Sequence, residues 1–557
     1  MNFETLLDAL IRDTTGKSLY LFAPELTICA TIVVLLLFRL VGLDRVIRPV
    51  TVALFGGLVG LAFAAAEYYG LIHGTQGPEK LFTGLLLFDQ FTVFFRLFLL
   101  TFIIFVTALT AISGIPDYED GPDFYTLLFG ATLGMLLMAS ANNLLILFLG
   151  VEMASVPSYA MVGFLKGRPK SSEASLKFVV YGAGAAGVML YGVSLLAGLL
   201  GTANFTEMAA NLDQVIGAAG MRDATVRTVL LGALMVFVGL AFKLSIVPFH
   251  FWCPDAFEGA AAEVAGYLSV ASKAAAFALL IRFCHILLGQ HVEGLAQLNY
   301  ALGIGLGLVA ALTATFGNLA AYSQRNVKRL LAYSTIAHAG YMLMAVAAMM
   351  VIANGPHVPN VDVAFNVTRS LQGLLYYLCV YMFMNLGAFA VVALIRNEIF
   401  SEDIDDYAGL AQQAPRYCLC MAVCMFSLIG LPPFGGFFAK WSIFAPLLQA
   451  GYVNKAMWGV LVIGGVNTVF SLFYYVRVLK AMYIAPRPAG ARVATESGPA
   501  GAFALVLALP VLLTGIGVTP VLRLTQAAAA SVFETSPTTQ VARLAPEPPA
   551  AEAPPKL

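Results

Sequence analysis

The sequence predicts an all-α polytopic membrane protein with about 14 transmembrane helices, two inverted five-helix repeats and broken helices. Its 557 residues are 60% hydrophobic and only 11% charged, whereas a soluble protein is about a quarter charged. Many apolar runs reach the roughly 20 residues that span a bilayer. Lipid excludes strands with open edges, and the alternating pattern of a barrel is absent, so these runs are predicted to be helices.

The apolar runs predict fourteen spans, and two of them contain a proline-phenylalanine break. Pro248-Phe249 interrupts the seventh span, and Pro432-Pro433-Phe434 interrupts the twelfth. The breaks lie five spans apart, and an odd number of spans per copy inverts the second copy, a common transporter plan. The spans are expected near residues 19–40, 47–70, 86–112, 122–140, 143–165, 175–200, 226–251, 262–287, 298–320, 327–352, 368–395, 414–447, 455–483 and 501–522.

The repeat divides the chain into predicted parts. Residues 204–216 are either a short amphipathic helix on the outer surface or an ordinary loop, and the sequence leaves both open. The Ala- and Pro-rich end is expected to be disordered. The parts are N-terminal helices 1–3 in residues 1–121, the first repeat in 122–290, the second in 291–485, a final helix in 486–526 and the tail in 527–557.

Orientation follows from Lys and Arg in alternate loops, because cytoplasmic loops carry the excess of positive charge. The richer set is predicted to be cytoplasmic, which places both termini in the periplasm of a bacterial cell inner membrane. Residues 1–18 lack a basic n-region, so no cleavable signal peptide is expected. The richer loops hold Arg45, Arg48, Lys166, Arg168, Lys170, Arg325, Lys328, Arg329, Lys480, Arg487 and Arg492.

Four charged residues lie deep in apolar runs: Glu152, Lys243, Lys273 and Lys440. A charge at the bilayer centre costs about 2.5–3.5 kcal/mol on insertion scales, so four on separate helices require a shared polar environment. The carboxylate of Glu152 is expected to pair with a lysine on a neighbouring helix. Such a pair can carry a proton or be only structural, and we favour a functional role for all four.

Pro248 has no N–H, so the carbonyl of Leu244 is predicted to lose its helical partner. Unwound backbone at membrane depth is tolerated only where it faces protein or water, which predicts a polar cavity beside Lys243. Burial disfavours the charged lysine, and a nearby carboxylate favours it. His250 would share the face of Lys243 only in a straight helix, and its role is left open.

Three further positions remain ambiguous from the residues alone. Lys177 either snorkels to the cytoplasmic side or lies on the path, and His338 is either a relay or a structural histidine. Arg96 is expected near an interface with Asp89. Lys328 and Arg329 are more simply cytoplasmic anchors.

No cofactor site is predicted. Gly182, Gly184 and Gly187 fit G-x-G-x-x-G, but the run lies inside a span without a βαβ unit, so close helix packing is the better interpretation. Cys418, Cys420 and Cys424 lack CxxC spacing, and packing is favoured over a metal or iron–sulfur site. The net charge is zero, so nothing suggests nucleic acid.

Several stretches resemble the antiporter-like subunits of respiratory complex I. They are LFLGVEMASVPSYA, SSEASLKF, FKLSIVPFHFWCPDAFEGA, LSVASKAAAFALLIRF, NVKRLLAYSTIAHAGYML and LPPFGGFFAKW, which reach across spans five to twelve. One related subunit has a glutamate where Lys440 stands, and another carries a long lateral C-terminal helix; this chain has neither. A departure is 260–263, AAAE, where the family has a proline-bearing turn, which leaves the loop shape and any role of Glu263 open.

The resemblance implies functional residues at matching positions. The family's glutamate of the fifth span falls on Glu152 and its sixth-span lysine on Lys177, which favours a functional role there. The remaining matches are Lys243, Lys273, Lys440, His250 and His338.

The resemblance also implies a function: a proton-translocating membrane-arm subunit without a redox centre of its own. NADH, FMN, iron–sulfur clusters and quinone would belong to partner subunits, and the partners would be other membrane-arm subunits, including a related antiporter-like subunit. A signal from them would weaken the pairing of Glu152 with Lys243 or Lys177, and protons would then pass from Lys243 to Lys273 and leave through Lys440. The alternatives are a subunit of a multi-subunit cation/proton antiporter and a non-transporting scaffold.

Overall fold

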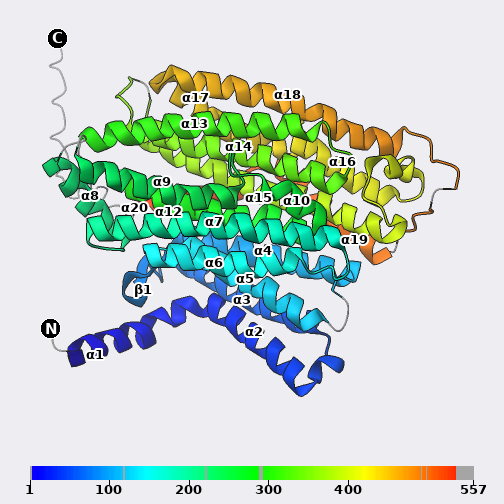
Figure 1. Ribbon diagram of the computed structural model, residues 1–557, viewed down its shortest axis with the longest axis horizontal. Coiled ribbons are helices and arrows are strands. Elements are labelled where there is room, and N and C mark those ends of the chain that lie inside the picture. The colour runs from blue at the N-terminus through cyan, green and yellow to red at the C-terminus, as the bar shows by residue number, and fades with distance from the viewer. Residues whose placement is uncertain are drawn as a thin grey trace, which may run out of the picture.

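The protein is a bundle of long helices, most of which run along one common direction in the computed structural model (Figure 1). The structure describes residues 3–116, 120–219, 223–287, 293–359, 361–490, 492–496 and 498–534. In these residues, 13 helices are long and apolar enough to cross a membrane. They include α2 (Ala23–Val41), α3 (Pro49–Ile72), α4 (Gln90–Ser113), α5 (Gly121–Ser140), α6 (Leu144–Val162), α7 (Pro169–Leu200), α9 (Ala224–Leu244), α13 (Glu293–Ala321), α14 (Val327–Asn354), α15 (Val363–Ile399), α18 (Lys455–Tyr483) and α19 (Gly498–Ile516).

The thirteenth crossing is a helix with an internal π-helical turn. It consists of α11 (Ala262–Tyr267), the turn η6 (Leu268–Ser272) and α12 (Lys273–Leu287). The predicted twelfth span, 414–447, completes the fourteen as two half-helices, α16 (Pro415–Ile429) and α17 (Gly435–Val453). The seventh span is broken too, because α9 ends at Leu244 and its chain continues as α10 (Trp252–Gly259). Both predicted breaks are therefore present.

The two five-helix repeats run in opposite senses. The first comprises α5, α6, α7, α9 with α10, and α11 with α12; the second comprises α13, α14, α15, α16 with α17, and α18. β-Bridges mark the two ends of the bundle. Asn143 pairs with Asn204 at one end, and Asn326 pairs with Asp403 at the other. Because α5 and α13 start from opposite ends, the fold is the predicted inverted repeat of broken helices.

The end that carries the bridge between Asn326 and Asp403 is called the basic end below. It includes the loops 42–48, 163–168, 322–326 and 484–490, which hold most of the Lys and Arg of the richer loop set. In Figure 1 the yellow and orange loops of this end lie on the right, whereas α1 (Phe3–Asp13) lies on the left.

Short elements cover the opposite end. A hairpin of β1 (Glu79–Leu81) and β2 (Leu86–Phe88) is antiparallel, with Glu79 opposite Phe88. Helix α8 (Phe205–Ala219) is the amphipathic helix that the sequence allowed as one of two alternatives, because Phe205, Met208, Leu212 and Ile216 are buried along one face.

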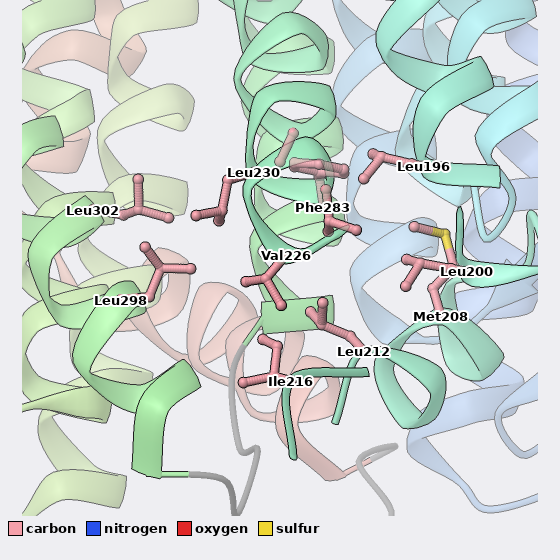
Figure 2. A pocket seen from close by; sticks show the side chains of 12 residues that line it. Leu196, Leu200, Met208, Leu212, Ile216, Val226, Leu230, Phe283, Leu298 and Leu302 are labelled. Carbon is pink, nitrogen blue, oxygen red and sulfur yellow. The ribbon is translucent and has the colours of Figure 1, made fainter. Parts of the chain in front are cut away.

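Helix α8 also lines one side of an apolar cavity. Figure 2 shows Met208, Leu212 and Ile216 of α8 facing Val226 of α9 and Phe283 of α12, with Leu298 and Leu302 of α13 on the other side. The lining residues are all apolar. This cavity therefore lies apart from the buried charges.

The predicted disordered tail begins too early. Residues 527–534 belong to α20 (Thr519–Glu534), and Ala528, Ala529 and Val532 are buried. Alanine is the best helix former, and here an alanine face packs against α4 and α15. The hydroxyl of Ser531 also accepts a hydrogen bond from the backbone N–H of Phe91 at 3.1 Å. The rest of the predicted tail, 535–557, lies outside the described residues.

Arg96 and Asp89, which were expected near the same interface, have different buried partners. Arg96 of α4 donates from Nε to Glu25 of α2 and from Nη1 to Glu67 of α3, each at 2.8 Å. Asp89 instead accepts two 2.7 Å bonds from Arg282 of α12. Both groups of ion pairs are buried. In each group the arginine is paired with carboxylate, so its charge is not left unpaired in the apolar interior.

Candidate functional site: a line of buried charges

The break in the seventh span has the geometry that the sequence predicted. Helix α9 ends one residue after the buried Lys243, and Ser245 follows in the left-handed conformation at φ 57°. The carbonyl of Leu244 is left without a helical donor because Pro248 has no N–H. The Nζ of Lys273 donates a hydrogen bond to this carbonyl at 3.1 Å. A second buried lysine therefore occupies the gap beside Lys243.

Lys273 connects the two repeats. Its Nζ also donates to the backbone carbonyl of Thr335 on α14, at 3.1 Å. Lys273 directly follows the π-turn η6, and such turns widen a helix locally and occur often at functional sites. The ammonium group thus lies between the broken helix of the first repeat and the second helix of the other.

The second break repeats this arrangement. Ile429 lies four residues before Pro433, just as Leu244 lies four residues before Pro248. The Ile429 carbonyl accepts a 2.8 Å hydrogen bond from Nζ of Lys440. The same ammonium lies 4.8 Å from the ring centroid of Tyr341, within cation–π range. In both halves a freed helix-end carbonyl therefore holds a lysine.

His338 lies between the two lysines in a tyrosine cluster. Its Nδ1 contacts the hydroxyl of Tyr377 at 2.5 Å and its Nε2 contacts that of Tyr475 at 3.1 Å. The hydroxyl of Tyr475 also lies 2.5 Å from that of Ser334. Lys273 and Lys440 are the charged groups that act on His338 electrostatically. His338 is thus hydrogen-bonded on both ring nitrogens, as a relay requires.

The tyrosines of this cluster were missed in the sequence. Tyr377 and Tyr381 are four residues apart on α15, and Tyr474 and Tyr475 lie on α18, all fully buried. A signal was present, because a buried tyrosine hydroxyl needs a partner and several at one depth indicate a polar interior.

Glu152 and Lys243 line one small cavity between α6, α7 and α9, together with Ser155 and Tyr159. The two charges interact electrostatically, although the described residues hold no ion pair within 4 Å between them. Glu152 is only half-buried, and Met153 and Val156 beside it are exposed apolar residues. The line of charges therefore reaches the outer surface of the bundle at Glu152.

Lys177 does not contact Glu152. Its Nζ pairs with Asp255 of α10 at 2.8 Å and with Glu173 at 2.7 Å. Arg329 of α14 donates to the same Asp255 and to Glu258, both at 2.7 Å. The expected pairing of Lys177 with Glu152 is therefore absent from this structure. Arg329, which was expected to be only a cytoplasmic anchor, instead connects α10 to the second repeat through these ion pairs.

Asp255 is expected to contribute stability through these two cations. Burial raises the pKa of its carboxyl, but hydrogen bonds from Lys177 and Arg329 outweigh burial and hold the pKa below the usual aspartate value. Because the folded-state pKa is lowered, the contribution is complete at neutral pH and disappears as the pH falls through that lowered value. Asp255→Asn should cost about 1 kcal/mol, seen as a lower thermal midpoint.

The control for this variant is Asp405→Asn, a change at an exposed aspartate of the same end. The difference between Asp255→Asn and the parent protein should be constant at neutral pH and vanish in acid. A difference that persists undiminished in acid would show that the carboxylate charge is not the cause.

His250 follows the break and does not continue the face of Lys243. Its ring packs against Phe316 of α13, with centroids 4.3 Å apart, and its buried Nδ1 has no hydrogen-bond partner. The helix that would have placed it above Lys243 has already ended at Leu244. The structure therefore does not join it to the line of lysines.

The expectation of close packing agrees with the structure at the cysteines and, within the glycine motif, at Gly182 only, because Gly184 and Gly187 are exposed. A Cβ atom at Gly182 would collide with the hydroxyl of Tyr159 on α6, so this glycine allows close contact between α6 and α7. Cys418, Cys420 and Cys424 are free and buried in the core. Within the described ranges, no group of three or more His, Cys, Asp or Glu side chains could hold a metal.

The arrangement defines a class of protein. Inverted repeats whose broken helices meet buried ionisable groups are the architecture of ion-translocating membrane proteins, and an intramembrane charge marks an ion or proton path by default. Here the line runs from Glu152 through Lys243, Lys273 and His338 to Lys440. The fold and the site therefore define an antiporter-like, multi-pass membrane subunit.

Comparison with known proteins narrows this class. Residues 141–471 match the family described as "NADH:quinone oxidoreductase/Mrp antiporter, TM". NADH-quinone oxidoreductase subunit N of Anaeromyxobacter sp. (strain Fw109-5) is 38% identical over 92% of this chain and 97% of its own length. Subunit N 2 of Sorangium cellulosum (strain So ce56) is 37% identical over 90% and 95%. The chain belongs to the family of NADH-quinone oxidoreductase subunit N.

Solved structures agree with the fold. A chain of the respiratory complex I from Thermus thermophilus with bound Aureothin is 29% identical, with a TM-score of 0.69 over 90% of this chain and 99% of that one. A chain of the Mrp complex from Dietzia sp. DQ12-45-1b shares the fold at 19% identity, with a TM-score of 0.75 over 94% and 99%. The resemblance to the antiporter-like subunits of respiratory complex I, which the sequence indicated, is therefore confirmed.

Proposed function

We propose that this chain is a proton-translocating membrane-arm subunit of NADH:quinone oxidoreductase. The observation that carries the proposal is Lys273, whose ammonium joins the broken helix of one repeat to α14 of the other through Leu244 and Thr335. A buried lysine that bridges both halves is suited to pass a proton between them, since only its protonation state needs to change.

The line supplies groups for each transfer. Lys243 loses its proton towards Lys273 when the field of Glu152 weakens, because a carboxylate favours the charged lysine beside it. Lys273 passes the proton towards His338, whose ring is hydrogen-bonded to Tyr377 and Tyr475. Lys440, held by the Ile429 carbonyl, then releases the proton to the other side.

Glu152 is the element of the line that a partner can reach. Its carboxylate is half-exposed among apolar residues of α6, which suits contact with another membrane-arm subunit, including a related antiporter-like subunit. A charge moved by that partner would change the interaction between Glu152 and Lys243. Lys177 pairs with Asp255 at the basic end and does not pair with Glu152. In this proposal it contributes to the local charge around Asp255.

The redox chemistry lies elsewhere in this proposal. NADH, FMN, iron–sulfur clusters and quinone belong to partner subunits, and this chain contributes to the translocase only through proton transfer. We place the basic end in the cytoplasm of a bacterial cell, in agreement with the excess of Lys and Arg in its loops. The membrane is then the inner membrane, and α1 lies towards the periplasm.

A cation/proton antiporter subunit is the second candidate. The shared fold of the Mrp chain supports it, but at 19% identity that likeness concerns the fold alone. The two functions differ in what drives transport. Proton flux that requires NADH oxidation in the assembled complex favours the first, and flux driven by a sodium gradient without NADH favours the second.

Lys243→Ala tests the proposed path. We expect a complex that assembles and still oxidises NADH, with several-fold lower proton flux per electron, because Lys243 is the group that Glu152 controls. Assembly is measured by native gel electrophoresis and flux by acidification of proteoliposomes. Lys455→Ala, at an exposed helix start, is the matched control.

A second variant, Lys243→Met, keeps the test valid if Lys243→Ala does not assemble. Lys243→Met keeps the length and apolar stem of the side chain, so it tests the charge with less disturbance of packing. Normal flux in an assembled complex with either substitution would refute the path and leave the scaffold as the better explanation.

A further inference from the structure

Glu263 is a buried carboxylate outside the line of charges. It is the second residue of α11, directly after the turn at the basic end, and it is 0% exposed. Neither carboxylate oxygen has a hydrogen-bond partner. An unpaired buried carboxylate is costly in its ionised form, so its retention calls for an explanation beyond packing.

The turn before Glu263 holds it in place. Ala260 and Ala261 adopt φ/ψ of −70°/161° and −60°/147°, which are polyproline II angles. The loop therefore has the extended shape that a proline would favour, without proline. Helix α11 begins directly after this extended segment, and the Glu263 carboxylate is buried inside the bundle.

The charged groups around Glu263 are already engaged with others. Lys328 of α14 donates to the Ala260 carbonyl at 2.7 Å and pairs with Glu402 at 2.9 Å. Arg396 of α15 also reaches Glu402, at 3.6 Å. Both cations act on Glu263 electrostatically, and the side chain of Ser113 on α4 also interacts with it. The charged groups on α10, Asp255 and Glu258, are bound by the other cations described above.

This environment suits a carboxyl that changes its protonation state. Two cations at longer range favour the ionised form, while complete burial without a direct partner favours the neutral form. Glu402 satisfies the cations in either case. Glu263 can therefore gain or lose a proton without breaking an ion pair.

Buried polar groups lie between Glu263 and Lys273 along the chain. The two ionisable residues lie ten residues apart on one helix, about 15 Å at 1.5 Å per residue. Between them the buried Ser269 accepts a 2.6 Å hydrogen bond from Asn385 of α15, and the Oδ1 of Asn385 has no partner. Ser269 and the buried Ser272 both lie in the π-turn η6. These groups can hold water between the two ionisable residues.

We propose that Glu263 is the proton-loading group of this chain, which takes up a proton at the basic end and delivers it to Lys273. The inference rests on the proposed function and adds an entry point at Lys273, separate from the transfer that Lys273 receives from Lys243. In the transfer the Glu263 O–H bond breaks, a proton moves along water and hydroxyl groups past Ser269, and an N–H bond forms on the neutral amine of Lys273. Glu263 returns to its carboxylate and is reprotonated from the basic side.

Glu263→Gln in the assembled complex is the decisive variant, because it keeps the shape of the side chain and removes the exchangeable proton. We expect a several-fold loss of NADH-driven proton flux. Glu263→Asp should retain flux but shift the alkaline limb of its pH profile to lower pH, since aspartate is the stronger acid. Glu398→Gln, which affects a carboxylate that binds Thr495 at the surface, should leave flux unchanged.

Lys273→Met, measured in parallel, separates the two proposals. Normal flux in Glu263→Gln with impaired flux in Lys273→Met would overturn the entry point alone, whereas normal flux in both would overturn the proposed function. An unshifted pH profile in Glu263→Asp would indicate a structural role and would also overturn the inference.

Infrared difference spectra decide the case if Glu263→Gln fails to assemble. A carboxyl band that appears with pH or turnover in the wild-type complex should shift in Glu263→Asp. If no carboxyl band differs between these two complexes, Glu263 does not exchange a proton and the inference is wrong.

Discussion

Lys273→Met should abolish proton transfer between the two repeats. The substitution keeps the apolar stem but removes the ammonium that binds the carbonyls of Leu244 and Thr335. A positioned proton-transfer group contributes about 10²–10⁴-fold to rate, so transfer through this chain should fall by about a hundredfold or more. The measurement is the number of protons translocated per NADH oxidised by the assembled complex in proteoliposomes.

The variant also leaves the Leu244 carbonyl, at the end of α9, without its donor. Leaving a buried acceptor unsatisfied costs about 1–3 kcal/mol, so assembly must be checked in the same preparation. Lys273→Arg keeps a charge and its hydrogen bonds but cannot release a proton, and it should therefore assemble well and still fail to translocate. Full translocation by Lys273→Arg would show that Lys273 acts through its charge alone.

Arg96→Met should have the largest effect on stability. Arg96 is the buried partner of both Glu25 and Glu67, and its removal leaves two carboxylates together in the interior of α2, α3 and α4. Breaking a buried ion pair by deleting one partner costs about 3–5 kcal/mol. The loss should appear as a lower denaturation midpoint of the purified complex or as reduced yield of the assembled complex.

Removing the remaining charges should reverse this loss. In Glu25→Gln/Glu67→Gln/Arg96→Met the buried carboxylates are gone, and neutral or apolar replacement of a buried ion network is often close to neutral for stability. Exposed Arg416→Met, whose contact with Glu496 is at 3.8 Å, is the control for loss of an ordinary surface arginine. A triple variant no more stable than Arg96→Met would contradict the electrostatic explanation.

The sequence by itself determined the class, the spans and the two breaks. These depend on local chemistry: apolar runs long enough for a bilayer, and prolines that cannot donate to the carbonyl four residues earlier. The released Leu244 carbonyl and the buried Lys243, Lys273 and Lys440 could be recognised for the same reason. Resemblance to a known family added the positions of His338 and Lys177.

Only the tertiary structure decided which groups meet. Lys273 donates to Thr335 across 62 residues, Lys177 pairs with Asp255 across 78, and Arg96 reaches Glu25 across 71. No local pattern contains such separations, because a partner is chosen by how helices pack and by which carbonyls and carboxylates remain unsatisfied once they have packed. The tyrosines around His338 and the unpartnered Glu263 became visible for this reason.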